Sequence, residues 1–145
     1  MIAKVKIILD AMGGDNAPDA NIKGAVNAIN KVKAEVVLVG KEEVIRGKIE
    51  EISARLKIKN ATETIEMEDV PTMAIKHKKD SSMVVGFRML KEDEGDVFIS
   101  AGNSGALLTG ATLIVGRIKG IDRPALAGIL PAYHSQLLLI DAGSN

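Results

Sequence analysis

The sequence predicts an α/β fold with three layers, in which helices cover both faces of a largely parallel sheet. Strand-like and helix-like segments alternate along most of the 145 residues, and three of the predicted strands end in loops rich in glycine. The composition, with 46% hydrophobic and 26% charged residues, is that of an ordinary globular domain. We therefore expect residues 1–145 to form a single α/β unit.

Separate hydrophobic patterns predict the elements of the first half of the chain. A short aliphatic run at residues 5–9 is typical of a buried strand, and residues 35–39 repeat that pattern. Apolar residues at the spacing of one helix face follow the first strand: Ile22, Ala25, Val26 and Ile29. A second amphipathic helix is marked in the same way by Ile45, Ile49, Ile52 and Leu56. Residues 61–66 predict a short further strand.

A basic segment and a capped helix are predicted next. Residues 71–79 begin with a proline and end in a basic run, and residues 80–82 offer capping side chains to a helix that Gly95 ends. The apolar residues of this helix are Met83, Val84, Phe87 and Leu90.

The last predicted elements are strands around one apolar helix. A strand at 96–100 leads to a helix at 106–115 that is apolar nearly all round, which predicts that this helix is buried. Strands at 126–130 and 137–140 follow, and a turn at 132–135 joins them.

The composition excludes several classes of function. Nineteen Lys and Arg balance nineteen Asp and Glu, which argues against a general nucleic-acid-binding protein, because such proteins carry a strongly basic face. The chain has no Cys and two His, so thiolate and multi-histidine metal centres are excluded. The glycine patterns of dinucleotide-binding and nucleoside-triphosphate-binding loops are absent. We therefore expect no nucleic-acid partner, no metal and no cofactor.

The uncharged stretches and the last residues bear on location and extent. The apolar part of residues 99–116 is too short for the roughly 20 residues of a spanning helix, and charged residues interrupt the N-terminal apolar run. These features predict a cytoplasmic protein. Residues 141–145 follow a predicted strand without the helix that should cover it, so we expect the N-terminal part of a longer protein.

Three predicted strands end in similar glycine-rich loops, at residues 10–15, 100–105 and 141–145. The carboxyl ends of parallel strands lie at one edge of a sheet, and ligands of open α/β sheets bind there. Glycine lets backbone N–H groups approach a ligand closely. In the middle loop, Asn103 or Ser104 can cap the next helix, whose start favours an anion. The alternative for this loop is a plain glycine turn with a capping residue.

Charged residues offer further candidates. The basic run at 76–79, with Ser81 and Ser82 after it, can complete a phosphate pocket or form a solvated turn before a capped helix. A second basic group can bind an anionic substrate or an acidic partner, or interact with the dipole of the helix before it; its members are Arg117, Lys119 and Arg123. Asp10 and Asp15 can bind a cation, act in acid–base chemistry or order the turn, which is the default.

Four stretches of the chain carry a resemblance to a known family. They are LDAMGGDNAP at 9–18, KKDSSMVV at 78–85, SAGNSGALL at 100–108 and GATLIVGRIKGIDRPA at 110–125. In this order they closely resemble the bacterial phosphate acyltransferases of phospholipid synthesis, of the PlsX type. Two positions depart from the family pattern, Ser104 where Thr is usual and Ser144 where Ala is usual. The family pattern also continues past Asn145.

The resemblance implies a fold like that of isocitrate and isopropylmalate dehydrogenases, and a homodimer. It implies a reaction in which inorganic phosphate attacks the thioester of a long-chain acyl-[acyl carrier protein], giving acyl-phosphate and free carrier protein. It also implies a cytoplasmic enzyme that is peripheral at the inner face of the membrane and passes acyl-phosphate to a membrane glycerol-3-phosphate acyltransferase.

This reaction gives roles to the candidate residues. Because phosphate is the nucleophile, the protein must hold an anion in line with a carbonyl group and stabilise an oxyanion. We expect Asn103 and Ser104 to be catalytic, with Gly102 and Gly105 completing the phosphate cradle. The remaining predicted site residues are Gly13, Gly14, Lys79, Ser81, Ser82, Arg117 and Arg123, which bind phosphate or supply supporting charge, and Asp10 and Asp15, which order the adjoining loop.

Two alternatives stay open at this point. The chain can belong to a phosphate acetyltransferase or butyryltransferase that acts on coenzyme A thioesters, since the same fold and the same edge of the sheet would serve that reaction. It can also be a non-catalytic fragment that binds phosphate or an acidic carrier protein. For residues 1–145 alone we expect little or no turnover.

Overall fold

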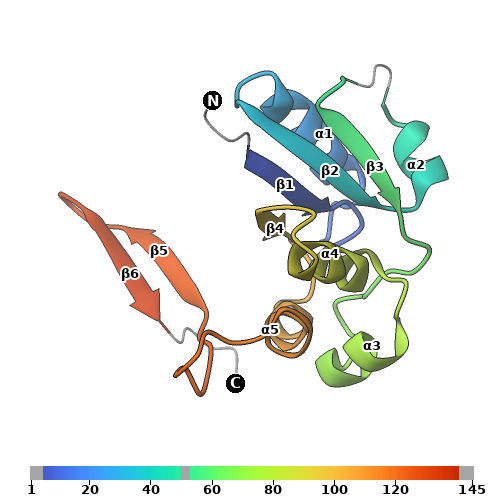
Figure 1. Ribbon diagram of the computed structural model, residues 1–145. Coiled ribbons are helices and arrows are strands. Elements are labelled where there is room, and N and C mark those ends of the chain that lie inside the picture. Colours follow the sequence, from blue (N-terminus) through green and yellow to red (C-terminus); the bar gives the residue numbers. More distant parts are fainter. Residues whose placement is uncertain (1–4, 50–52, 141–145) are drawn as a thin grey trace.

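Four parallel strands form the sheet that carries the candidate site. The computed structural model describes residues 5–49 and 53–140, and its main sheet has the strand order β3-β2-β1-β4 (Figure 1). The strands are β1 (Val5–Asp10), β2 (Ala34–Gly40), β3 (Leu56–Asn60) and β4 (Val97–Ile99). Each pairing within this sheet is parallel. The predicted parallel sheet is therefore confirmed.

Helices cover both faces of this sheet. They are α1 (Asp19–Ile29), α2 (Glu42–Arg46), α3 (Pro71–His77), α4 (Ser82–Lys91) and α5 (Ser104–Gly110), which continues as the short π-helix η1 (Ala111–Val115). Alternate residues of β2 show the layers: Val36 and Leu38 pack in a buried cluster with α1 and α2, whereas Val37 and Val39 pack with α4 on the opposite face. This alternation confirms the predicted three layers.

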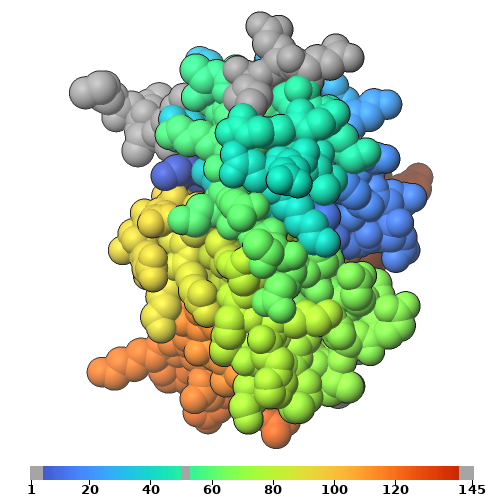
Figure 2. Space-filling model, turned by 90° about the vertical axis from the view of Figure 1, so that its right-hand side faces the viewer, coloured from blue at the N-terminus to red at the C-terminus, as the bar shows by residue number. Residues whose placement is uncertain are grey.

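A second group of helices extends the layer formed by α4. Residues of α3, α4 and α5 share one buried cluster, and the ring of Phe87 in α4 lies 4.7 Å from that of Phe98 in β4. A Cβ on Gly110 would lie 2.3 Å from the Phe87 ring, so α5 packs closely on α4. From the side, α2, β3 and α3 form one continuous face (Figure 2). Within the described ranges, no helix is long and apolar enough to cross a membrane.

Two side chains cap the helices that begin near the candidate site. The hydroxyl of Ser81 accepts a hydrogen bond of 3.3 Å from the N–H of Val84 at the start of α4. The side-chain oxygen of Asn103 accepts one of 2.9 Å from the N–H of Ala106 at the start of α5. The predicted caps are confirmed, and the structure selects Ser81 and Asn103 from the candidates that the sequence offered.

The predicted second helix is present but shorter than expected, and the short strand predicted after it is wrong. The helix ends at Arg46, and Leu56 begins strand β3, where it pairs with Val36 of β2. Residues 61–66 contain only an isolated bridge between Glu63 and Ser81. The spacing of the apolar residues suggested a helix that reaches Leu56. In the structure Leu56 belongs to β3, which pairs with β2, and its side chain packs in the core of the sheet. Ile52 lies outside the described residues.

The predicted strands near the end of the described chain form a hairpin of their own. Strands β5 (Ala127–Pro131) and β6 (Gln136–Ile140) pair antiparallel in a two-stranded sheet that stands away from the parallel one (Figure 1). Large apolar side chains are exposed along it, with Ile129 66% and Leu138 56% exposed. The idea that β6 ends at the same edge as β1 and β4 is therefore wrong, and residues 141–145 lie outside the described residues.

The apolar helix before the hairpin is only partly buried. Ala106 and Gly110 are buried, but Leu113 is 68% exposed. The prediction of a buried helix is thus correct for the face of α5 that packs on α4 and wrong for η1.

Candidate functional site

Two glycine-rich loops meet at the carboxyl edge of the sheet. The first loop follows β1 and the second follows β4, its neighbour in the sheet. A Cβ on Gly13 would lie 3.1 Å from the Cα of Gly102, so the two backbones are in direct contact. Gly14 has a positive φ of 109°, a conformation that favours glycine. The predicted convergence of these two loops is confirmed.

Asp10 holds the two loops together. One of its carboxylate oxygens accepts hydrogen bonds from the N–H groups of Met12 (3.0 Å) and Gly13 (3.1 Å). The other oxygen accepts one of 2.8 Å from the hydroxyl of Ser100, and that hydroxyl accepts one of 3.1 Å from the N–H of Gly102. Asp10 is 1% exposed. Its side chain is therefore committed to the order of the loops.

The sequence reasoning missed a second residue that braces the first loop. The side-chain amide of Asn21, in α1, donates to the carbonyl oxygens of Asp10 (3.2 Å), Ala11 (3.2 Å) and Gly13 (2.8 Å). No sequence pattern marks this contact, because it depends on how α1 packs behind the loop. Ser100 was missed in the same way, although its polar side chain at the end of a predicted strand was a possible signal.

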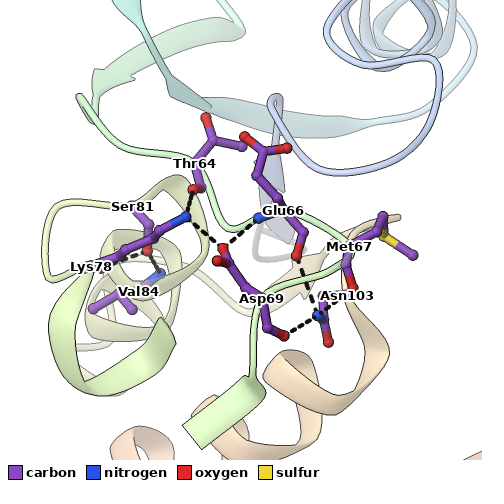
Figure 3. Close-up of polar contacts among 8 residues, drawn as sticks. All are labelled: Thr64, Glu66, Met67, Asp69, Lys78, Ser81, Val84 and Asn103. Carbon is purple, nitrogen blue, oxygen red and sulfur yellow. Dashed lines mark hydrogen bonds and ion pairs between the residues drawn. The ribbon is translucent and has the colours of Figure 1, made fainter. Parts of the chain in front are cut away.

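Asn103 joins the second loop to a distant turn. Its side-chain nitrogen donates to the carbonyl oxygens of Glu66 (3.3 Å), Met67 (3.1 Å) and Asp69 (3.1 Å), while its oxygen caps α5 (Figure 3). The residue is 7% exposed. Both ends of the amide are therefore occupied by protein groups.

We call residues 64–69 the bridging turn, because a second contact holds it from the other side. The ammonium of Lys78 lies 2.5 Å from a carboxylate oxygen of Asp69 and 2.9 Å from the carbonyl oxygen of Thr64 (Figure 3). The same Asp69 oxygen accepts a hydrogen bond of 2.8 Å from the N–H of Glu66. The hydrogen bond from Lys78 and then that from Glu66 hold the pKa of the Asp69 carboxyl below its ordinary value.

The network of contacts continues into the start of α4. The hydroxyl of Ser81 donates a hydrogen bond of 2.8 Å to the carbonyl oxygen of Lys78 and also caps α4. Both its donor and its acceptor therefore bind protein groups. Ser81 and Ser82 are buried, whereas Lys79 is exposed and its ammonium donates 3.3 Å to the carbonyl oxygen of Ile75. Lys78 belongs to the predicted basic run, of which only Lys79 was named as a site residue, and it is Lys78 that enters the network.

Asp80 binds Thr62, which lies just before the bridging turn. Its carboxylate accepts hydrogen bonds from the hydroxyl (2.5 Å) and the N–H (2.9 Å) of Thr62. These two contacts, the hydroxyl first, hold the pKa of the Asp80 carboxyl below its ordinary value.

A cavity of about 440 Å³ lies between the first glycine loop and the bridging turn. It is lined on one side by residues that include Met12 and Gly14, and on the other by residues 64–68. Its volume falls within the range of about 300–1,000 Å³ that small-molecule sites occupy. Its charged lining residues are Lys41, Asp15, Glu66 and Glu68. Three carboxylates against one ammonium give this cavity a negative lining.

The other predicted residues take separate positions. Ser104 is exposed at the first position of α5, and Gly105 packs so closely on Pro71 that a Cβ would lie 2.7 Å from its ring. Arg117 and Arg123 are exposed beyond η1, and Arg117 donates to the carbonyl oxygen of Asp122. Among the described contacts, none joins either arginine to the glycine loops. The described residues hold no group of three or more metal-ligating side chains placed around one point.

Comparisons with known proteins agree over nearly the whole chain. The model of the family described as "Fatty acid synthesis protein" matches residues 5–145. The phosphate acyltransferase of Acetivibrio thermocellus is 54% identical over 147 aligned residues, which cover 96% of this chain and 42% of that protein. The phosphate acyltransferases of Thermoanaerobacter pseudethanolicus and Clostridioides difficile are 53% and 46% identical, each over 97% of this chain. The chain thus spans less than half the length of these curated relatives.

Proposed function

From the premise that the chain belongs to the fatty acid synthesis protein family, we propose that it contributes the phosphate site of a phosphate acyltransferase. In the proposed reaction, an oxygen of inorganic phosphate attacks the carbonyl carbon of a long-chain acyl-[acyl carrier protein]. The carbon–sulfur bond breaks, the acyl group stays on phosphate, and the carrier thiol leaves with the proton that phosphate loses. The names of the relatives support the phosphate acyltransferase activity.

The observation that carries this proposal is the contact between the two glycine loops at the carboxyl edge of the sheet. Gly13 and Gly102 touch there, and Asp10 orders both loops without offering its charge to a ligand. Rigid backbone N–H groups at such a place can hold an anion and stabilise an oxyanion, because they need no reorganisation during the reaction.

Each residue of the second loop takes a distinct role in the proposal. Gly102 lets the second loop come close to the first, Gly105 lets α5 come close to Pro71, and the exposed Ser104 supplies a hydroxyl donor at the start of α5. Among the described contacts, the N–H groups of Ser104 and Gly105 have no acceptor within the protein, and they are the donors that we assign to phosphate or to the oxyanion. We assign Asn103 to the cap that aims this helix start.

The other predicted site residues act around this cradle. Gly13 and Gly14 form the facing loop, Lys79 supplies positive charge, and the buried Ser81 and Ser82 fix the start of α4. We propose that the exposed Arg117 and Arg123 contact the acidic carrier protein, because they lie apart from the loops. Asp15 lines the cavity beside the first loop.

Partners beyond the substrates are part of the same proposal. We propose that the complete enzyme is a homodimer, and the exposed apolar hairpin is a surface that another part of the assembly would cover. We also propose that the enzyme works at the inner face of the membrane and passes acyl-phosphate to a membrane glycerol-3-phosphate acyltransferase. Acyl-phosphate with a long chain partitions into membranes, which favours transfer at that surface.

One assay tests the reaction. The full chain that carries residues 1–145 is incubated with phosphate and palmitoyl-[acyl carrier protein], and acyl-phosphate is trapped with hydroxylamine. Formation of the hydroxamate only in the presence of phosphate supports the proposal. Product from palmitoyl-, acetyl- or butyryl-coenzyme A but not from the carrier protein would favour the coenzyme A alternative. Phosphate binding without product from either thioester would favour a non-catalytic binding module.

Ser104 offers a matched pair of variants for this assay. We expect Ser104→Ala to lower kcat/KM about 10–100-fold, because one donor to the charged transition state is lost. Ser104→Thr keeps the hydroxyl and is expected to retain activity. Equal activity of the Ala and Thr variants would remove Ser104 from the site.

A further inference from the structure

The bridging turn is held by two side chains, those of Asn103 and Lys78, whose polar atoms are engaged within the protein. Asn103 donates to three of its carbonyl oxygens from the start of α5. Lys78 binds its Asp69 carboxylate and its Thr64 carbonyl from the end of α3. The turn therefore connects α5 with the junction of α3 and α4 (Figure 3). These contacts fix the turn relative to the helix start that we assign to phosphate.

The same turn is one wall of the 440 Å³ cavity. Residues 64–68 line it without a break, and Met12 and Gly14 of the first loop line the opposite side. The opposite side is already fixed by Asp10 and Ser100. The width of the cavity therefore depends on where the bridging turn lies, and that position depends on Asp69, Lys78 and Asn103.

The charges of the lining select the kind of ligand. Asp15, Glu66 and Glu68 outnumber Lys41, so the cavity repels a multiply charged anion such as phosphate. Backbone groups and the side chains of Met12 and Met67 offer polar and apolar contacts to an uncharged ligand. The part of the proposed substrates that fits this chemistry is the uncharged amide-and-thioester arm by which the acyl group is carried.

We propose that this cavity binds the uncharged arm of the acyl thioester and that Asp69, Lys78 and Asn103 are positioning residues that set its wall. The proposal rests on the proposed function for the identity of the substrate. The three side chains act through the backbone of the bridging turn, since their polar atoms are engaged within the protein. In the proposed function phosphate binds at the start of α5, whose residues are not among those that line this cavity.

The proposal predicts a difference between the two substrates. In the full chain that carries residues 1–145, Asp69→Asn and Asn103→Asp are each expected to raise KM for palmitoyl-[acyl carrier protein] about tenfold, through the loss of a charge-assisted or multiple hydrogen bond. KM for phosphate is expected to change less than about twofold in Asp69→Asn, whereas Asn103→Asp also places a negative charge beside the helix start assigned to phosphate and is read only for its effect on the thioester. Asn103→Asp is chosen because its carboxylate can still cap α5 while losing the donors to the turn.

Two further variants separate positioning from general damage. Lys78→Arg keeps a cation beside Asp69 and is expected to restore most of the substrate affinity that Lys78→Met loses. Asp19→Asn is the matched control, because Asp19 also lies 2.5 Å from a lysine ammonium, that of Lys48, but far along the chain from the turn. We expect both KM values of this control to stay unchanged.

Hydrogen exchange requires no turnover, so it tests the cavity assignment separately from the proposed function. Hydrogen exchange of the amides at 64–69 is expected to be faster in Asp69→Asn and Asn103→Asp, and a palmitoyl-pantetheine probe is expected to slow exchange there in the wild type. If no acyl-phosphate forms but this protection is seen, the proposed function fails and the cavity assignment stands. The assignment is overturned if the probe leaves the turn unprotected, or if Asp69→Asn weakens phosphate and the thioester equally.

Discussion

The carboxylate of Asp10 and the hydroxyl of Ser100 lie 2.8 Å apart although 90 positions separate them in the chain. The hydrogen bond joins the ends of the neighbouring strands β1 and β4, where the two glycine loops begin. Each partner also accepts a hydrogen bond from an N–H of its own loop, from Gly13 and Gly102 respectively. This pair therefore couples the two loops that we assign to the phosphate site.

Removal of either partner is expected to destabilise the protein. Asp10→Ala leaves buried N–H donors without an acceptor and should lower the free energy of unfolding by about 3 kcal/mol, and Ser100→Ala by about 1 kcal/mol. Because the two residues contact each other, the double variant should lose less than the sum. Urea unfolding of the four proteins measures this coupling, and strictly additive losses would contradict it.

The contact between the glycine loops predicts a contrast between two glycine substitutions. A Cβ on Gly13 would lie 2.5 Å from a carboxylate oxygen of Asp10, so Gly13→Ala should cost about 1–3 kcal/mol of stability. Gly24 lies in α1 with nothing within 4 Å of a new Cβ, so Gly24→Ala should stabilise the protein by about 0.5–1 kcal/mol. Thermal melting of both variants checks the opposite signs.

Acid is expected to loosen the bridging turn. Lys78 and Thr62 hold the pKa values of Asp69 and Asp80 below their ordinary values, so the folded protein binds fewer protons than the unfolded chain. The stability that these contacts contribute is complete above the ordinary carboxyl pKa of about 4, and it is lost as the pH falls through the lower folded values.

The variant that tests this pH dependence is the double substitution of Asp69→Asn and Asp80→Asn. Urea midpoints measured from about pH 6 down to about pH 2 should fall less steeply for it than for the wild type. An unchanged slope would show that other carboxyl groups dominate the acid sensitivity.

The exposed hairpin predicts self-association of residues 1–145. Ile129 and Leu138 pair directly across β5 and β6 and are both more than half exposed, and a contiguous apolar surface of this kind favours association. Sedimentation velocity should show a mass that rises with concentration. Leu138→Lys should reduce that association while changing the melting temperature little, since the side chain is exposed. A monomer at every concentration would contradict the prediction.

Local patterns predicted a large part of the fold because they report which face of each element is buried. The alternation in β2 and the helical spacing of Ile22, Ala25 and Ile29 require one sheet between two layers, and the structure has it. The same reasoning failed at Leu56, whose spacing fits a helix and whose backbone pairs with β2. A short apolar run fits the residue spacing of a helix and that of a strand, so only pairing with a partner strand distinguishes the two structures.

The candidate site also has a part that the sequence predicts and a part that it does not. The glycines of residues 10–15 and 100–105 could be predicted, because strand ends in a parallel sheet converge wherever the strands are ordered. The contacts of Asn21, Ser100, Asp69 and Lys78 could not, because each joins the side chain to a segment that packing brings near it. Composition and periodicity are properties of neighbours along the chain, and they determined the layers, the helix caps and the glycine loops.

Only the tertiary structure decided that Asn103 and Lys78 both hold the bridging turn and that this turn forms one wall of a cavity. Such contacts join residues that are far apart in sequence, and their bond energy depends on distances that no local pattern contains.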